Sequence, residues 1–238
     1  MKIRHKNIVL VLALLLLHLI SCDDGRIYAD YDIDDETTTI HVTANINGID
    51  KWPKGYNIAI AAFGDDSEYA IVSKVISKPN NDLNHVDVRL SGITADATTV
   101  ELCAIDALRR KVVSFYRVDF SHTGDTLHAD ACNIDADMYD AIQSQIFATT
   151  CTACHGGGET AAAGLYLTAD RSRDALVNHT SRKEPALQLV TPGDSHNSVL
   201  YKTLATDISS SWRINHAQMV FEDIKLNLVA DWIDNGCK

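Results

Sequence analysis

Cys151, Cys154 and His155 form a C-x-x-C-H motif, in which two thiols and an imidazole lie within five consecutive positions. Side chains three positions apart on a helix face the same side, so both sulfurs can bond to one edge of a flat ligand. His155 would then lie beneath the centre of that ligand, where a ring nitrogen can bind iron. This spacing is typical of covalent c-type haem attachment with a proximal histidine. We therefore predict one covalent haem c, because the chain contains one such motif.

Three other interpretations of the motif were weighed. A zinc site would need two more Cys or His ligands, and the sequence has no second C-x-x-C and no H-x-x-H pair. A thioredoxin-like redox pair would need a preceding strand in a βαβ unit, whereas the residues before Cys151 have a helical pattern. A structural disulfide would leave His155 and the glycines Gly156–Gly158 without a role. We expect these glycines to let the backbone approach the porphyrin closely.

The N-terminus predicts export with a lipid anchor. Basic residues within Met1–Lys6 precede an apolar run, Ile8–Ile20, that is too short to cross a membrane as a helix. Leu19–Cys22 resembles the lipobox of bacterial lipoproteins, so we predict a signal peptide over 1–21, acylation of Cys22 and a short linker over 22–26. Several acyl chains anchor a protein stably in a bilayer. The alternative is a plain secretory signal, in which Cys22 is a thiol or a disulfide partner.

The charge balance limits the possible partners. The formal net charge is −11 at pH 7. The predicted signal peptide contains Lys and Arg but no acidic residue, so its removal would make the net charge more negative. Nucleic-acid binding is therefore excluded, because it depends on clustered Lys and Arg. We predict the cell envelope as the location, on the periplasmic or outer-surface side of a membrane. The predicted partners are the lipid bilayer and redox proteins at the membrane.

Residues 27–132 have the pattern of short strands. Apolar and polar residues alternate in seven runs bounded by Gly, Pro, Asn and Asp, which predicts an all-β immunoglobulin-like sandwich. The runs are Thr39–Ile46, Asn57–Ala61, Ala70–Ile76, His85–Leu90, Thr99–Ile105, Lys111–Val118 and Thr126–Ala129. This half carries no catalytic motif, and its histidines are scattered without ligand-like spacing. We predict surface positions for them, and a spacer or docking role for the domain.

The periodicity becomes helical after Cys132, so we predict a second domain over 133–238. One apolar face runs from Met138 to Ile146 and leads directly into Cys151. Further helices are predicted from Ser195 or Ser198 to Leu204 and along the stripe Ile224–Ile233, which ends at Gly236, and less clearly over Arg171–Val177.

Residues 133–238 resemble the small class I cytochrome c domains found at the ends of exported bacterial proteins. The resemblance rests on Cys151–Gly157, Ala163–Thr168, Thr191–Asp194 with Ser198–Tyr201, and Trp232–Gly236. It implies an all-α cytochrome c-like domain whose first and last helices cross, with a loop before the last helix that presents the sixth iron ligand. The whole chain resembles cytochrome lipoproteins in which a β-rich domain precedes such a module. The Met-Pro dipeptide usual in the ligand loop is absent, and Cys237 replaces a small residue.

The resemblance leaves two candidates for the sixth ligand. Met219 has the residue type that class I cytochromes use. His216 fits the register better, because the ligand in that family precedes the Trp-Ile pair by about the distance that separates His216 from Trp232. We favour His216, which would make the haem bis-histidine, and Met219 stays the alternative.

The resemblance also bears on the leftover cysteines. Cys132 and Cys237 lie just outside the first and last helices, whose outer ends approach in that family, so a disulfide between them is predicted. Cys103 would then be a buried thiol.

The leading function is one-electron transfer, which would make the protein an electron carrier rather than an enzyme. The first alternative is a haem enzyme of peroxidase type, with Arg213 and His216 on the open side of the iron. The second is a binding lipoprotein whose β-sandwich recognises a partner and whose haem is structural or sensory.

Overall fold

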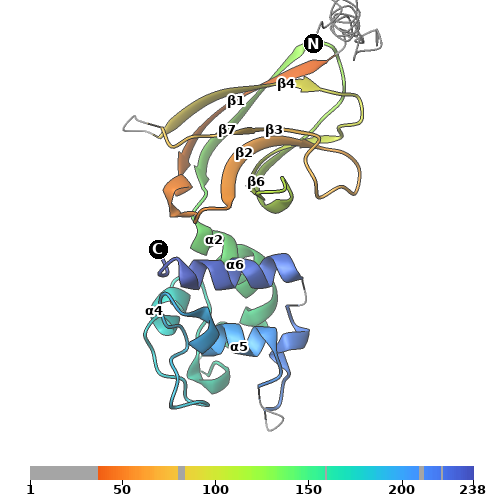
Figure 1. The fold of residues 1–238 in the computed structure, drawn as a ribbon. Helices are drawn as coiled ribbons and strands as arrows, with labels where there is room; N and C mark the ends of the chain where they lie inside the picture. The colour runs from red at the N-terminus through yellow and green to blue at the C-terminus, as the bar shows by residue number, and fades with distance from the viewer. Residues whose placement is uncertain (1–36, 80–83, 159, 209–211, 221) are drawn as a thin grey trace, which may run out of the picture. The chain divides into compact units, whose positions relative to one another are not determined.

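The structure is a computed structural model that describes residues 37–79, 84–158, 160–208, 212–220 and 222–238 (Figure 1). The predicted signal peptide, the acylated Cys22 and the linker lie outside these residues. All described residues belong to one compact unit, Glu36–Lys238. The predicted division into two domains between residues 132 and 133 stays a prediction.

Strands make up the N-terminal part of the described chain. They are β1 (Thr38–Asn47), β2 (Tyr56–Phe63), β3 (Val72–Val75), β4 (His85–Ile93), β5 (Thr99–Asp106), β6 (Lys111–Asp119) and β7 (Thr126–Asp135). They form two sheets, one in the order β4-β1-β7 and the other in the order β3-β2-β5-β6. Each strand overlaps one of the alternating runs of the sequence.

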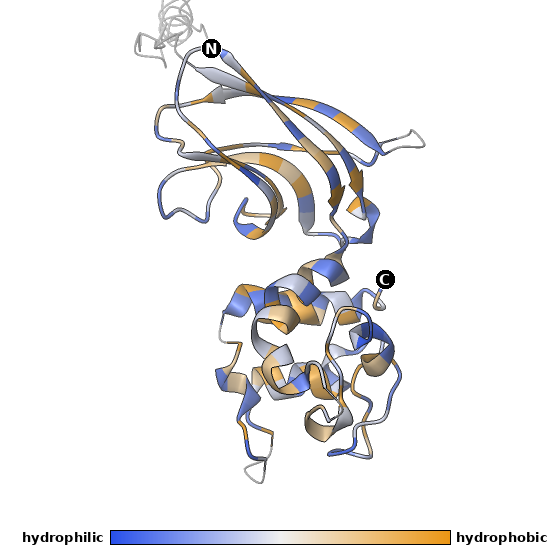
Figure 2. Cartoon of the chain, turned by 180° about the vertical axis from the view of Figure 1, so that it is seen from behind, coloured by the Kyte–Doolittle hydropathy of each residue, from blue (hydrophilic) through white to orange (hydrophobic). Residues whose placement is uncertain are grey.

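The alternation in the sequence explains how these strands pack. Along β1 every second side chain is buried, and Figure 2 shows this period as alternating orange and blue bands. The buried set from β1 meets apolar side chains of β2, β4 and β5 in one hydrophobic core. β2 and β5 are buried on both faces over most of their length, as expected of the two middle strands of their sheet.

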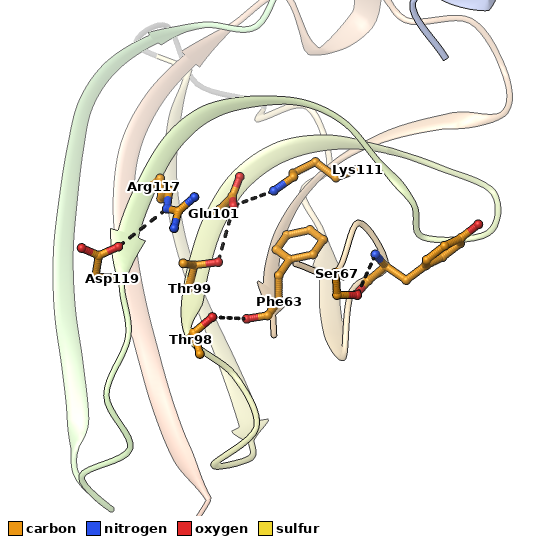
Figure 3. A network of polar contacts seen from close by, with 9 residues as sticks. Phe63, Ser67, Thr98, Thr99, Glu101, Lys111, Arg117 and Asp119 are labelled. Atoms are coloured by element: carbon orange, nitrogen blue, oxygen red, sulfur yellow. Dashed lines mark hydrogen bonds and ion pairs between the residues drawn. The ribbon is translucent and has the colours of Figure 1, made fainter. Parts of the chain in front are cut away.

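A buried ion pair lies on β5. Glu101 is 1% exposed, and its Oε1 accepts a hydrogen bond from Nζ of Lys111 at 2.8 Å (Figure 3). The same ammonium lies 4.6 Å from the ring centroid of Phe63, a cation–π contact. Oε2 of Glu101 has no hydrogen-bond partner within the described part of the chain. Lys111 is therefore the group that balances this buried charge.

Helices follow the strands. They are α2 (Met138–Ile142), a π-helical segment (Gln143–Cys151), α3 (Thr152–His155), α4 (Ser172–Leu176), α5 (Val199–Ala205) and α6 (Asp223–Asp234). Short 3₁₀ turns lie at Ile49–Lys51, Ala162–Gly164, Ser195–Asn197 and His216–Gln218. Apolar side chains of these helices and the loops between them form a second buried cluster, whose fully buried members include Trp232, Ile142, Phe147 and Val229.

The predicted fold class is wrong. An all-β immunoglobulin-like sandwich followed by an all-α cytochrome c-like domain was expected, whereas the chain has a mixed β-rich fold with two sheets and short C-terminal helices. β1 pairs with β7 in parallel, and β7 continues to Asp135, inside the region expected to be all-α. Most of residues 156–198 form loops. Two isolated β-bridges connect these loops, one between Val177 and Val190 and one between Thr180 and Gln188. An all-α domain is not indicated.

Candidate functional site

The C-x-x-C-H motif ends a continuous helical stretch that begins at Met138. The Asp137 carboxylate caps its start by accepting a hydrogen bond from the backbone N–H of Tyr139 at 2.8 Å. The middle of the stretch is π-helical, and the N–H of Thr152 bonds to the carbonyl of Phe147, five residues earlier. Such widened turns occur frequently at functional sites. The motif therefore lies on a rigid element with a local irregularity directly before it.

The side chains of Cys151, Cys154 and His155 line a cavity of about 750 Å³. Volumes of about 300–1,000 Å³ are typical of cofactor and ligand pockets. The opposite walls are largely apolar, with Leu165, Leu167, Leu176, Leu189, Val199, Leu200 and Leu204 among the lining residues. The cavity can therefore hold a large, flat, apolar group against both thiols and the imidazole.

A hydrogen bond to the backbone orients the ring of His155. Its Nδ1 lies 3.2 Å from the carbonyl oxygen of Leu165, and this oxygen can only accept. Nδ1 therefore carries the hydrogen, which leaves the lone pair of a neutral ring on Nε2. Metal-binding histidines commonly have such a partner on the second nitrogen. The backbone is held here too, because the N–H of Leu167 donates to the carbonyl of His155 at 2.7 Å.

The ring of His216 lies near that of His155. Their ring centroids are 6.2 Å apart with an interplanar angle of 37°. A metal–imidazole bond of about 2.0–2.1 Å, with the ring centroid roughly 1 Å beyond the nitrogen, places two axial rings on one metal about 6 Å apart. The observed separation therefore fits one ion between the two rings.

The surroundings of His216 keep its imidazole neutral. Burial lowers its pKa, and the nearby His155 lowers it further, while a hydrogen bond to the backbone of Ile214 acts in the opposite direction. Trp212 packs edge-on against the ring, with centroids 5.9 Å apart. A neutral ring keeps the lone pair that a metal requires.

Met219 lines the same cavity but is 45% exposed. It directly follows the 3₁₀ turn His216–Gln218, and its backbone N–H donates to the carbonyl of His216 at 2.9 Å. Both predicted candidates for the sixth ligand thus belong to one turn at the cavity.

The thiols of the motif differ in their environments. Cys154 is exposed, whereas Cys151 is partly buried and burial raises its pKa to about 11, with a smaller contribution from Cys154. Reactive cysteines of thiol–disulfide enzymes have lowered pKa values, because the thiolate is their nucleophile. This environment therefore gives no support to a thioredoxin-like pair.

Gly156 has a steric reason for its position. A Cβ there would lie 2.1 Å from the carbonyl oxygen of Thr152, whereas a Cβ on Gly157 or Gly158 would have no atom within 4 Å. Only the first glycine of the run is thus needed for a close approach, and that approach is to the preceding helical turn.

The other three cysteines of the described residues, Cys103, Cys132 and Cys237, are not among the residues that line this cavity. Cys132 is exposed on β7, and Cys237 is buried beside α6. Both are free thiols in the structure, and the disulfide between them stays a prediction. Cys103 on β5 is a buried thiol, and burial raises its pKa to about 12.

Sequence reasoning missed several cationic residues of the cavity wall. Arg182 and Lys183 line it together with His179 and Arg213, and only Arg213 was singled out beforehand. Their residue types could have indicated a role, because cationic side chains near a haem motif can form ion pairs with carboxylates of a bound group.

Comparison with known proteins gave no match: no family model fits the chain, and no curated protein or solved structure is similar to it. The geometry of the site is therefore the basis for its chemistry.

The described residues also limit metal binding by side chains alone and membrane spanning. No three His, Cys, Asp or Glu side chains among them converge on a position that could hold a metal ion. No helix in the same residues is long and apolar enough to span a membrane.

Proposed function

We propose that the protein is an exported, lipid-anchored monohaem c-type cytochrome that transfers single electrons. Cys151 and Cys154 would bind the haem through thioethers, and His155 would be the proximal iron ligand. The observation that carries the proposal is the pair of imidazoles, His155 and His216, whose ring centroids lie 6.2 Å apart at the cavity that both cysteines line.

The ligand count supports haem over a bare metal ion. A structural zinc site has four side-chain ligands and a catalytic one has three, and the described residues bring no such group together. Two opposed imidazoles suit an iron whose other four ligands come from a macrocycle. The apolar walls and the volume of the cavity suit the body of that macrocycle.

His216 is the better candidate for the sixth ligand. Its ring has the separation from His155 that a shared iron needs, and burial favours its neutral form. Met219 is half exposed, and its nearness to His216 makes it the control residue. Two histidine ligands would give a lower reduction potential than a His/Met pair, because methionine ligation raises it.

Two histidine ligands, His155 and His216, would also favour electron transfer over catalysis. Haem supplies the one-electron redox couple when bound, and the protein supplies ligands, a dry pocket and access for partners. A peroxidase needs an open position on the iron, so Arg213 and His216 in the cavity wall would serve catalysis only if His216 stayed off the iron.

Export and anchoring complete the proposal. Acylated Cys22 would hold the chain at a membrane on the periplasmic or outer-surface side, where redox proteins are the expected partners. The N-terminal sequence supports this part, as do the two cysteines of the motif, because covalent haem attachment and export are consistent with each other.

The test is expression in a host that matures c-type haem. We expect a pyridine haemochrome spectrum with one haem per chain, and an intact mass that includes a covalent haem. The oxidised protein should be low-spin and lack the long-wavelength charge-transfer band of methionine ligation. Protein from the same host that contains zinc and no haem would refute the proposal.

A further inference from the structure

A pair of histidines lies on the polar face of the β4-β1-β7 sheet. His41 on β1 and His128 on β7 are register partners in the parallel pair, so their side chains project from the same face of the sheet. Their Nδ1 atoms lie 3.2 Å apart. We propose that these two nitrogens form a binding site for a divalent late transition-metal ion, separate from the haem cavity.

Asp87 on β4 orients the first of these rings. Its Oδ1 lies 2.6 Å from Nε2 of His41. An ionised carboxylate can only accept, so Nε2 carries the hydrogen and Nδ1 of the neutral His41 ring presents its lone pair toward His128. A carboxylate behind a metal-binding histidine is the usual outer partner of such sites, because it fixes the ring and raises its basicity.

The separation of the nitrogens fits a shared metal. With metal–nitrogen bonds of about 2.0–2.1 Å, two imidazole ligands lie about 2.9 Å apart at a right angle and about 3.4 Å apart at the tetrahedral angle. The observed 3.2 Å falls between these values. The rings are also inclined by 72°, so they do not stack and both nitrogens can point at one ion.

The same separation allows a hydrogen bond between the rings when no metal is present. Nδ1 of His128 would then donate to Nδ1 of His41. On metal binding this proton would move through solvent to Nε2 of His128, so that the ring stays neutral and Nδ1 gains the lone pair that the metal needs. His128 is exposed, so solvent can carry this proton. The metal-free pair is therefore already close to the bound geometry.

The ligand set defines the class of metal. Imidazole nitrogen suits Zn²⁺, Cu²⁺ and Ni²⁺, and affinity rises toward Cu²⁺. Among the described residues no group of three His, Cys, Asp or Glu could hold a metal ion, and Asp87 bonds to the other nitrogen of His41, so solvent would complete the coordination shell. Such a site binds exchangeable metal and leaves positions open, in contrast to the closed shell of a structural zinc site.

Metal uptake by the full-length mature protein tests the site. Equilibrium dialysis against Zn²⁺, with zinc and iron measured separately by elemental analysis, should give one saturable zinc per chain whether or not haem is bound. Replacing Zn²⁺ by Cu²⁺ should give tighter binding, and the copper should show hyperfine coupling to two nitrogens in its electron paramagnetic resonance spectrum.

Variants assign the ligands. His41→Gln and His128→Gln are each expected to weaken zinc binding by at least about tenfold, and Asp87→Asn by about tenfold, the usual effect of losing an outer partner. His85→Gln is the matched control, since His85 lies on the same sheet and bonds to Asn45 instead. His128→Gln changes an exposed residue, so its fold is expected to stay intact. Absence of saturable uptake, equal uptake by His128→Gln, or an equal loss in His85→Gln would each overturn the proposal.

Discussion

Gly156→Ala is expected to damage the candidate haem site through a purely steric effect. The new Cβ would lie 2.1 Å from the carbonyl oxygen of Thr152 and 3.1 Å from its carbonyl carbon. Both are backbone atoms of the preceding helical turn, so no side-chain rotation can relieve the contact.

The size of the destabilisation depends on the backbone atoms that must shift to make room for the Cβ. Overpacking against fixed atoms costs about 1–3 kcal/mol. A shift at residue 156 also strains the hydrogen bond from Leu167 to the carbonyl of His155, which contributes roughly 1 kcal/mol. We therefore expect Gly156→Ala to lower the free energy of unfolding by about 2–4 kcal/mol. For a chain of this length each kcal/mol lowers Tm by about 2–4 °C, so the expected decrease is roughly 5–15 °C.

Gly157→Ala is the matched control. It makes the same chemical change one position later, where a Cβ meets no atom within 4 Å. Thermal unfolding followed by circular dichroism compares the two variants, and haem per chain reports on the position of His155. Equal Tm values and equal haem content in the two variants would contradict the steric argument.

Four further predictions follow from the site and the core. His216→Ala is expected to convert a low-spin haem to a high-spin form that binds carbon monoxide, whereas Met219→Ala should leave the visible spectrum unchanged. Cys154→Ala should leave one thioether, so covalent attachment should be less complete and the haem that stays with the chain in acidified organic solvent should decrease to less than one per chain. Lys111→Met should destabilise the protein by about 3 kcal/mol in urea denaturation, because Glu101 keeps a buried charge without its cation. Burial lowers the pKa of His216, so the unfolded state of haem-free protein binds protons first and stability should decrease from about pH 7 to pH 5.

Local sequence patterns predicted the positions of the strands well. Alternation of polar and apolar residues located each strand, because burial of one sheet face imposes a period of two. The C-x-x-C-H motif needs only neighbouring positions, and Cys151, Cys154 and His155 do line one cavity. Gly236 at the end of α6 was also placed correctly, and the backbone N–H of Cys237 bonds to the carbonyl of Trp232 in that cap.

The fold class could not be predicted in the same way, because it depends on pairings between distant residues. Asn133, Ile134 and Asp135 continue β7 since they pair with the end of β1, nearly ninety positions earlier in the chain. The local sequence around these residues does not show which distant strand they pair with. The helices are short because loops between them, rather than long apolar stripes, complete the second core.

The two pairs of opposed histidines show how distant contacts produce chemistry. His41 and His128 looked scattered because the parallel register of β1 and β7 cannot be inferred from spacing, and His155 and His216 are joined only by the packing of a turn against a helix. In both cases one ring is fixed by an acceptor on its second nitrogen, the Asp87 carboxylate or the Leu165 carbonyl. The ring separations differ, at 5.1 Å and 6.2 Å between centroids, because the first pair meets at an angle while the second pair lies across a cavity. The first arrangement suits two adjacent ligands on one ion and the second suits two axial ligands, so the sites are expected to differ in the metal they hold.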